Sequence, residues 1–289
     1  AKESFLKALE IPEAAFELGE MFFEDQKPWE AEPFYRKAAE AGHVGAQYSL
    51  GYLLDRGEGV QKNREEAEKW FLLAAEKGSA GAQFEMGELA YYQRDFEKAR
   101  EWYHRAADQD HPDAQYSLGF MHEGGKGLPR DLLEAAVWYR KAAEREHLDA
   151  EYRLGLLLVQ EEPEQAKEWL QKAADRNHPA AQFELSTLLQ DNRKSLFWCQ
   201  KSAELGNVDA QYKLGFRYLH GQEIPQDLAK AAHWLTKAAE QGDEMSQVNL
   251  GHLYEQENDL EKAAFWYRKA AEAGDGTARE RLASLEKRE

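Results

Sequence analysis

The chain has 289 residues, and 54 Asp and Glu against 37 Lys and Arg give it a formal net charge of −17. Nucleic acid and anionic membrane surfaces repel such a protein, so neither is an expected partner. No run of apolar residues approaches the ~20 that span a bilayer, so direct membrane insertion is not expected. The single cysteine, Cys199, excludes an intrachain disulfide and a cysteine-based zinc site.

In chain order, residues 1–11 come first, and we expect them to be the remnant of a preceding helix, because they read as the close of a helix whose start is missing. Residues 12–274 then contain eight near-copies of one unit, in which a pair of small residues returns at intervals of 29 to 36 residues. A Leu-Gly step, with Met or Ser once each in place of one residue, also returns in every copy, at Gly19, Gly51, Gly87, Gly119, Gly155, Ser186, Gly215 and Gly251. A period in the thirties is typical of solenoids built from helix pairs.

Residues 45–78 show how one unit is built. Apolar residues at helical spacing predict a first helix, A, which the Gly57-Glu58-Gly59 segment ends. Asn63 is expected to cap a second helix, B, and Gly78 suits the left-handed position after its last turn. We expect the glycine of the Leu-Gly step to let helices A and B approach closely, with Trp70 and its equivalents filling the remaining space.

Residues 275–289 are predicted to form a C-terminal capping helix. Ala278 and Leu282 provide one apolar face, and most of the other positions are charged. One face on the stack and one in water is what the last helix of a repeat array needs. The whole chain, 1–289, is therefore expected to be a single repeat array.

These residues resemble the Sel1-like repeat family, a relative of the tetratricopeptide repeats. Its pattern of A-x-x-x-L-G followed by W-Y-x-K-A-A is matched closely by Ala210–Gly242 and Ala114–Ala143, and the resemblance covers residues 14–274. It implies an all-α fold, a right-handed superhelical solenoid of antiparallel helix pairs with about eight repeats. The family serves in many unrelated complexes, so the resemblance implies protein binding and leaves the partner open.

The residues that suggest catalytic chemistry all fit the repeat pattern. Four histidines occupy one inter-repeat position, where other copies have Ser, Asn or Asp; they are His43, His111, His147 and His178. The segment Gly124–Gly127 resembles a phosphate-binding loop, but its spacing fails. Cys199 takes a slot that Tyr fills elsewhere and is expected to be packed. We therefore expect no catalytic residue, no cofactor and no metal, and the protein is not expected to be an enzyme.

Two rows of side chains on the A helices are the candidate partner-binding residues of a concave groove. The first row lies three residues before the Leu-Gly glycine and includes Tyr48, Phe84, Tyr116, Tyr152, Phe183 and Tyr212. The second row directly follows that glycine and includes Tyr52, Glu88, Phe120, Phe216 and His252. Aromatic side chains in a groove are frequent anchors of an interface. Packing between neighbouring repeats explains the first row equally well, so both interpretations stay open.

Three functional hypotheses follow. The first is a non-enzymatic adaptor or scaffold that holds a protein partner, one with a basic or extended segment, in the groove. The second is a dedicated inhibitor of the immunity type that neutralises a toxin or enzyme, by analogy with bacterial Sel1-like proteins. A hydrolase is a remote third. The sequence leaves open the compartment (cytoplasmic, periplasmic or secreted), the oligomeric state and the identity of the partner.

Overall fold

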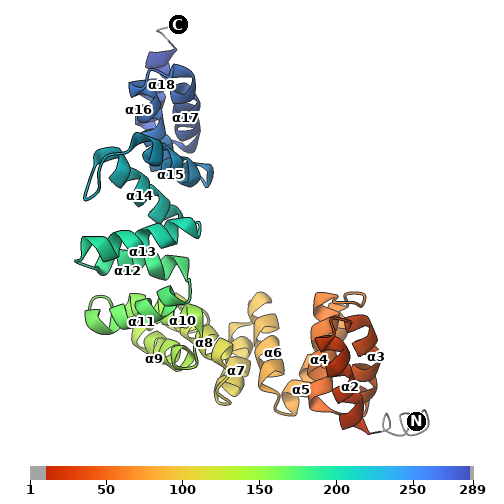
Figure 1. The fold of residues 1–289 in the computed structure, drawn as a ribbon. Coiled ribbons are helices and arrows are strands. Elements are labelled where there is room, and N and C mark those ends of the chain that lie inside the picture. The colour runs from red at the N-terminus through yellow and green to blue at the C-terminus, as the bar shows by residue number, and fades with distance from the viewer. Residues whose placement is uncertain (1–10, 287–289) are drawn as a thin grey trace. The chain divides into compact units, whose positions relative to one another are not determined.

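A computed structural model describes residues 11–286, and every regular element in that range is an α-helix (Figure 1). The A helices are α2 (Pro12–Glu24), α4 (Val44–Arg56), α6 (Ala80–Tyr92), α8 (Pro112–Gly124), α10 (Leu148–Leu158), α12 (Pro179–Leu188), α14 (Val208–His220), α16 (Glu244–Gln256) and α18 (Gly276–Leu285). The B helices are α3 (Pro28–Glu40), α5 (Arg64–Glu76), α7 (Phe96–Ala107), α9 (Leu132–Glu144), α11 (Pro163–Asp175), α13 (Asn192–Glu204), α15 (Leu228–Glu240) and α17 (Leu260–Ala273). The predicted all-α array of helix pairs is confirmed.

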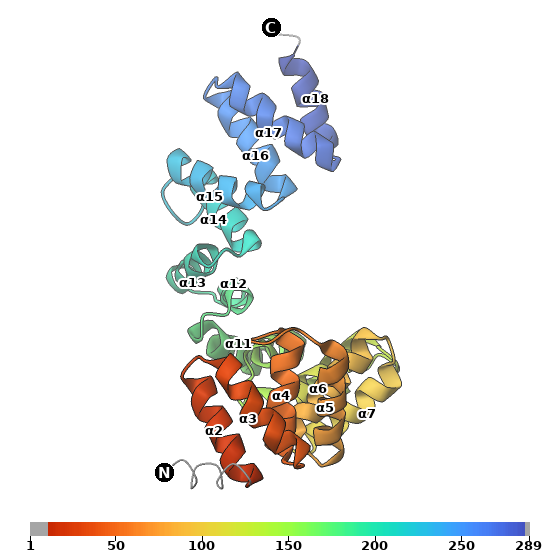
Figure 2. The ribbon, with the colours of Figure 1, turned by 90° about the vertical axis from the view of Figure 1, so that its right-hand side faces the viewer.

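The chain divides into two compact units, Ala1–Ala150 and Glu151–Glu289, with the boundary inside α10. In the first unit each helix packs against the next, and Figure 2 shows α2 to α7 lying side by side. In the second unit the pairs α12 with α13, α14 with α15, and α16 with α17 pack in the same way. Helix α18 packs on α17 and buries Ala278 and Leu285. The expected helix remnant at 1–11 lies outside the described residues, except for Ile11. The last three residues of the expected capping helix, 287–289, also lie outside them.

The predicted caps explain where the helices begin and end. The Nδ1 atom of His43 accepts a hydrogen bond from the backbone N of Ala46 at 3.1 Å, and Asn207 caps α14 in the same way at 2.8 Å. Gly42 and its equivalents adopt positive φ after the B helices. Glu146 takes the same conformation, with φ of 61°, although a side chain in this region costs roughly 1 kcal/mol or more.

The space above each Leu-Gly glycine is filled by a ring or a leucine from helix B. A Cβ atom on Gly51 would lie 2.7 Å from Cε1 of Phe71, and one on Gly155 would lie 2.7 Å from Cγ of Leu170. The backbone of helix B also approaches some of these glycines, because a Cβ atom on Gly155 would lie 3.3 Å from the carbonyl oxygen of Ala166 and one on Gly215 would lie 3.0 Å from the backbone N of Leu235. The tryptophans differ between repeats: Trp102, Trp138 and Trp266 are buried as expected, whereas Trp70 is only half-buried beside the buried Phe71.

A glutamine on the A helix ties it to the preceding B helix. Gln47 is 3% exposed, and its Nε2 donates a 3.1 Å hydrogen bond to the carbonyl oxygen of Ala39 near the end of α3. The same bond recurs from Gln83 to Ala75 at 3.1 Å and from Gln211 to Ala203 at 3.1 Å. Helix ends leave carbonyl groups without intrahelical partners, so this side chain satisfies one of them inside the core.

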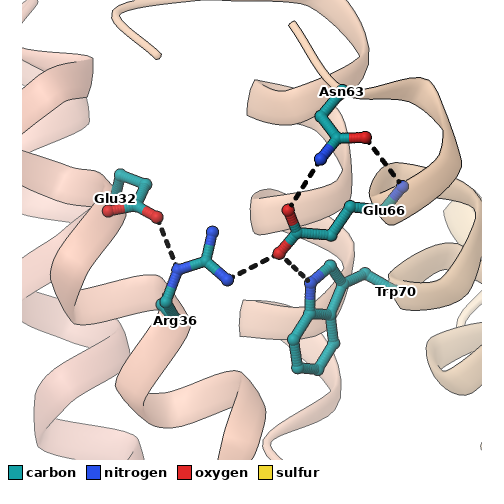
Figure 3. A network of polar contacts seen from close by, with 5 residues as sticks. All are labelled: Glu32, Arg36, Asn63, Glu66 and Trp70. Atoms are coloured by element: carbon teal, nitrogen blue, oxygen red, sulfur yellow. Dashed lines mark hydrogen bonds and ion pairs between the residues drawn. The ribbon is translucent and has the colours of Figure 1, made fainter. Parts of the chain in front are cut away.

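An ion-pair network links consecutive B helices of the first unit (Figure 3). Arg36 on α3 donates from Nη1 to Oε1 of Glu66 on α5 at 2.6 Å, and from Nε to Glu32 on its own helix at 2.6 Å. Glu66 also accepts hydrogen bonds from Trp70 and from the capping residue Asn63. The network therefore ties the first turn of α5 to the preceding repeat.

Candidate functional site

The first row of aromatic residues lies between consecutive repeats and is half-buried. Where the next repeat begins with a capping histidine, the aromatic ring stacks on that imidazole. The centroid distances are 4.5 Å for Phe16 on His43, 5.1 Å for Phe84 on His111, 4.6 Å for Tyr116 on His147 and 4.5 Å for Tyr152 on His178. The capping histidine therefore has two contacts, one to the backbone of its own helix and one to the preceding A helix.

Tyr48 has no histidine to stack on, because the next repeat begins with Ser79. Its ring lies against Gly81, where a Cβ atom would be 3.0 Å from the phenol Cζ. In the second unit, the ammonium of Lys213 lies over the ring of Phe183, 5.3 Å from its centroid. The rings of Tyr212 and Phe216 pack with their centroids 5.9 Å apart. The first row therefore contributes to packing between repeats, and its role in partner binding stays a prediction.

The second row places different chemistry at equivalent positions. Phe120 is 37% exposed, and Tyr52 has the guanidinium of Arg56 at 4.5 Å from its ring centroid. Phe216 packs on His220 at 4.3 Å. Glu88 and His252 each contact a tyrosine of the following helix B. The structure brings Tyr48 together with Tyr52, and Glu88 together with Tyr116 and Phe120, in two hollows of the first unit.

The first hollow lies between α2 and α4, with α3 behind it, and has a volume of about 270 Å³. Its lining includes Glu20, Phe23, Tyr35, Tyr48, Ser49 and Tyr52. The second hollow lies between α6 and α8, with α7 behind it, and has a volume of about 220 Å³. Its lining includes Glu88, Tyr91, Tyr103, Tyr116, Ser117 and Phe120, and Tyr92 stands beside them.

The two hollows are built from equivalent positions that lie 68 residues apart in the sequence. Glu20 corresponds to Glu88, Tyr35 to Tyr103 and Ser49 to Ser117. An aromatic ring is kept from Phe23 to Tyr91, from Tyr48 to Tyr116 and from Tyr52 to Phe120, and Tyr92 is the exception because Glu24 stands at its equivalent position. Repeat-by-repeat reasoning missed Glu20, Phe23, Tyr35, Tyr91, Tyr92 and Tyr103. The signal that could have found them is the alternation of 32-residue and 36-residue repeats in this part of the chain.

Each hollow holds a carboxylate against the hydroxyl of a buried tyrosine. Tyr35 donates to Oε1 of Glu20 at 2.6 Å, and Tyr103 donates to Oε1 of Glu88 at 2.5 Å. Burial, together with the neighbouring glutamate, raises the pKa of both phenols far above the ordinary value. The two tyrosines therefore stay protonated and act as hydrogen-bond donors that fix the carboxylates.

A further acidic residue, Glu85, lies near the carboxylate of the second hollow. Glu85, on the same helix as Glu88, has its pKa raised to about 6 by burial first and then by the charges of Glu88 and Asp55. The charges of Glu88 and Asp55 therefore add to the effect of burial at Glu85, and the charge of Arg56 opposes them. In the second unit the corresponding face is mixed, because Lys213 lies near Glu184 and burial lowers the pKa of its ammonium.

Within residues 11–286, no group of three or more His, Cys, Asp or Glu side chains is placed to hold a metal ion. None of the described helices is long and apolar enough to cross a membrane. Cys199 is fully buried, and burial raises the pKa of its thiol. The two hollows bring together five of the predicted site residues, Tyr48, Tyr52, Glu88, Tyr116 and Phe120, and are therefore taken as the candidate binding site.

Comparisons with a family model and with solved structures both point to the Sel1 repeat family. The sequence model of the Sel1 repeat matches residues 12–43, 44–79, 80–111, 112–147, 148–178, 179–207, 208–243 and 245–275. A comparison with curated protein sequences gives no match.

Several solved structures are similar to this chain. A protective antigen of uropathogenic Escherichia coli strains, described as having an SLR fold, is 34% identical over 94% of this chain, with a TM-score of 0.82. This chain spans 64% of the length of that antigen chain. A Sel1 repeat protein of Oxalobacter formigenes is 32% identical, with 98% of this chain and 90% of that chain covered and a TM-score of 0.77. An immunity protein of Pseudomonas aeruginosa is 20% identical over 57% of this chain and 69% of that chain, and its TM-score of 0.41 carries no argument about function.

Proposed function

Because this chain belongs to the Sel1 repeat family, whose members are generally protein-interaction scaffolds, we propose that it is a non-enzymatic scaffold that binds a protein partner. The binding surface is the face of α2, α4, α6 and α8 that contains the two hollows. The observation that carries this proposal is the equivalence of the hollows, which presents the same aromatic and carboxylate groups twice on one unit.

The chemistry of this surface suits a polypeptide. Aromatic anchors such as Tyr52 and Phe120 supply contact area, and the hollows can receive the side chains of an extended segment. The acidic groups and the net charge of −17 favour a basic partner segment and disfavour nucleic acid. The second-row residues vary between repeats, and such variation is what recognition of one partner requires.

A peptide-display selection tests this proposal. The immobilised chain is expected to enrich a common set of peptides from a random library, and a variant carrying Tyr52→Ala and Phe120→Ala is expected to lose that enrichment. The control carries Phe197→Ala and Phe265→Ala, which remove two aromatics that are 52% and 49% exposed outside the hollows. Circular dichroism and thermal unfolding check that all three chains fold.

The outcomes separate the alternatives. Unchanged enrichment by the Tyr52→Ala, Phe120→Ala variant would show that the hollows do not form the binding surface. No enrichment by the wild-type chain would contradict the scaffold proposal for short segments. An inhibitor of the immunity type would instead bind one folded enzyme tightly and stop its activity at a one-to-one ratio, and this is measured with the enzyme once a partner is identified.

A further inference from the structure

We propose that each hollow of the first unit is an aromatic cage for one cationic side chain, and that the preferred group is the guanidinium of an arginine in the partner. This inference rests on the proposed function and names the chemical group that the surface recognises. It requires three features of each hollow: a carboxylate without a cation, ring faces around it, and a donor that holds the carboxylate in place.

The first feature is an unneutralised carboxylate. All the hydrogen bonds recorded at Glu20 and Glu88 within residues 11–286 fall on Oε1. In the same range, neither carboxylate forms an ion pair with a Lys, Arg or His side chain. The Oε2 atom of each glutamate is therefore left for a group from outside the described chain. A cation that donates hydrogen bonds to Oε2 would both neutralise the carboxylate and satisfy this oxygen.

The second feature is the set of aromatic rings around that carboxylate. Tyr48, Tyr52 and Phe23 line the first hollow, and Tyr91, Tyr116 and Phe120 line the second. A cation is attracted to the face of an aromatic ring within about 6 Å of its centroid. Aromatic side chains around a carboxylate form the kind of cage that recognises organic cations, and a simple apolar pocket would not need the carboxylate.

The third feature is preorganisation. The phenols of Tyr35 and Tyr103 come from the B helices behind the hollows and hold the carboxylates at 2.6 and 2.5 Å. The position of each glutamate is therefore fixed before a ligand arrives, and this reduces the entropy that binding must remove. A fixed carboxylate beside fixed rings also favours a ligand of defined shape.

Arginine fits this arrangement better than lysine. Its guanidinium is planar, so it can stack on a ring and donate to a carboxylate at the same time. The chain itself shows the pairing, because the guanidinium of Arg56 lies over one face of Tyr52 at 4.5 Å from the ring centroid. This leaves Phe23, Tyr48 and the other face of Tyr52 for the arginine of the partner. The acidic residues near the second hollow, Glu85 and Asp113 among them, add attraction for any cation.

The test uses N-acetyl-arginine N-methylamide as the probe and nuclear magnetic resonance of the chain labelled with ¹³C-tyrosine. The signals of Tyr48 and Tyr52 report on the first hollow, and those of Tyr91 and Tyr116 report on the second. Saturable shifts at both sets are expected. The citrulline analogue, which has the same shape without the charge, is expected to give none, and the lysine analogue is expected to bind more weakly than arginine.

Two isosteric variants act as controls for each other. Glu88→Gln keeps an acceptor for Tyr103 and removes the charge, so it is expected to weaken binding at the second hollow roughly tenfold, because a charged partner is lost, and to leave the first hollow unchanged. Glu20→Gln is expected to do the reverse. Glu101→Gln, on the exposed surface of α7, controls for net charge and is expected to change neither.

Several results overturn the cage. These are the absence of any tyrosine shift up to the solubility limit of the probe, equal shifts with arginine and citrulline, and shifts that neither glutamine variant reduces. The peptide selection keeps this inference distinct from the proposed function. Enriched peptides that depend on Tyr52 and Phe120 but lack arginine would leave the scaffold standing and reject the cage.

Discussion

The phenol ring of Tyr103 lies directly over Gly87, so that a Cβ atom on this glycine would be 2.5 Å from Cδ1 of the ring. The contact joins helix A to helix B within one repeat. It also places the hydroxyl of Tyr103 where it donates to Glu88. One glycine therefore determines both the packing of the pair and the position of the carboxylate in the second hollow.

Gly87→Ala is expected to destabilise the fold by about 1–3 kcal/mol, because the added methyl group displaces the ring of Tyr103. The matched control is Gly276→Ala, at the start of α18, where an added Cβ meets no atom within 4 Å. That variant is expected to be neutral or slightly stabilising, since alanine loses less backbone entropy on folding. Chemical denaturation followed by circular dichroism measures both, and equal stabilities would contradict the packing argument.

Acidification is expected to weaken the junction that His111 caps. Burial lowers the pKa of this imidazole below its ordinary value of 6.5, so the folded state prefers the neutral ring. The neutral ring stabilises the fold at higher pH, and that contribution is lost as the pH falls below the unfolded pKa. Protonation also removes Nδ1 as an acceptor for the backbone N of Ala114.

Asn at position 111 supplies a cap that does not titrate, as Asn207 does at the equivalent position. His111→Asn is therefore expected to reduce the loss of stability between about pH 7 and pH 5. Thermal unfolding at several pH values measures this, with His233→Asn on exposed α15 as the control. A pH dependence identical to that of the wild type would reject the role of His111.

The bridge between Arg36 and Glu66 is expected to stabilise the first unit by about 1 kcal/mol, a modest value because both side chains remain about one-third exposed. Hydrogen bonding to Arg36 is the main cause that lowers the pKa of Glu66. The contribution is therefore present above about pH 4.5, the ordinary value, and is lost as the pH falls through the lower pKa of the folded state.

Glu66→Gln, measured by urea denaturation, is expected to lose this contribution at neutral pH and to unfold with less pH dependence in acid. Glu65→Gln, one residue earlier on the exposed side of the same turn, is the matched control. If both variants unfold at the same urea concentration at neutral pH, the bridge does not contribute to stability.

The thiol of Cys199 is expected to react slowly with Ellman's reagent in the folded chain. Its side chain is fully buried, and burial raises its pKa, so both access and thiolate content are low. In denaturant the reaction is expected to be fast and to give one thiol per chain. Rapid labelling of the native protein would show that α13 opens readily.

The repeat chemistry made most of the fold predictable. Local signals placed a helix start at Asn63 and a left-handed turn at Gly78, because capping depends on a few neighbouring residues. The sequence did not show which residues of the wide apolar stripe on helix B are buried. Helical spacing alone does not distinguish Trp70 from Phe71, and only packing shows that Phe71 is the buried one.

The candidate site was predictable only in part. Tyr48, Tyr52, Glu88, Tyr116 and Phe120 were found because they occupy fixed positions relative to the Leu-Gly glycine. The way in which these residues group into two hollows was not predictable, since each hollow is formed by two A helices and the B helix between them. Tyr35, for example, meets Glu20 within its own repeat, and Tyr48 joins the same hollow from the next repeat. Such contacts depend on how repeats stack, and a comparison of single repeats does not contain that information.

The 68-residue spacing of the hollows has a consequence for how such a chain can grow or shrink by recombination. Gain or loss of two consecutive repeats in this half of the chain keeps each glutamate opposite a pair of aromatic residues. Loss of residues 44–79 alone would put α6 in the place of α4. Glu85 and Glu88 would then stand where Ser49 and Tyr52 now face Glu20. In this half of the chain, the heritable module is therefore the pair of repeats.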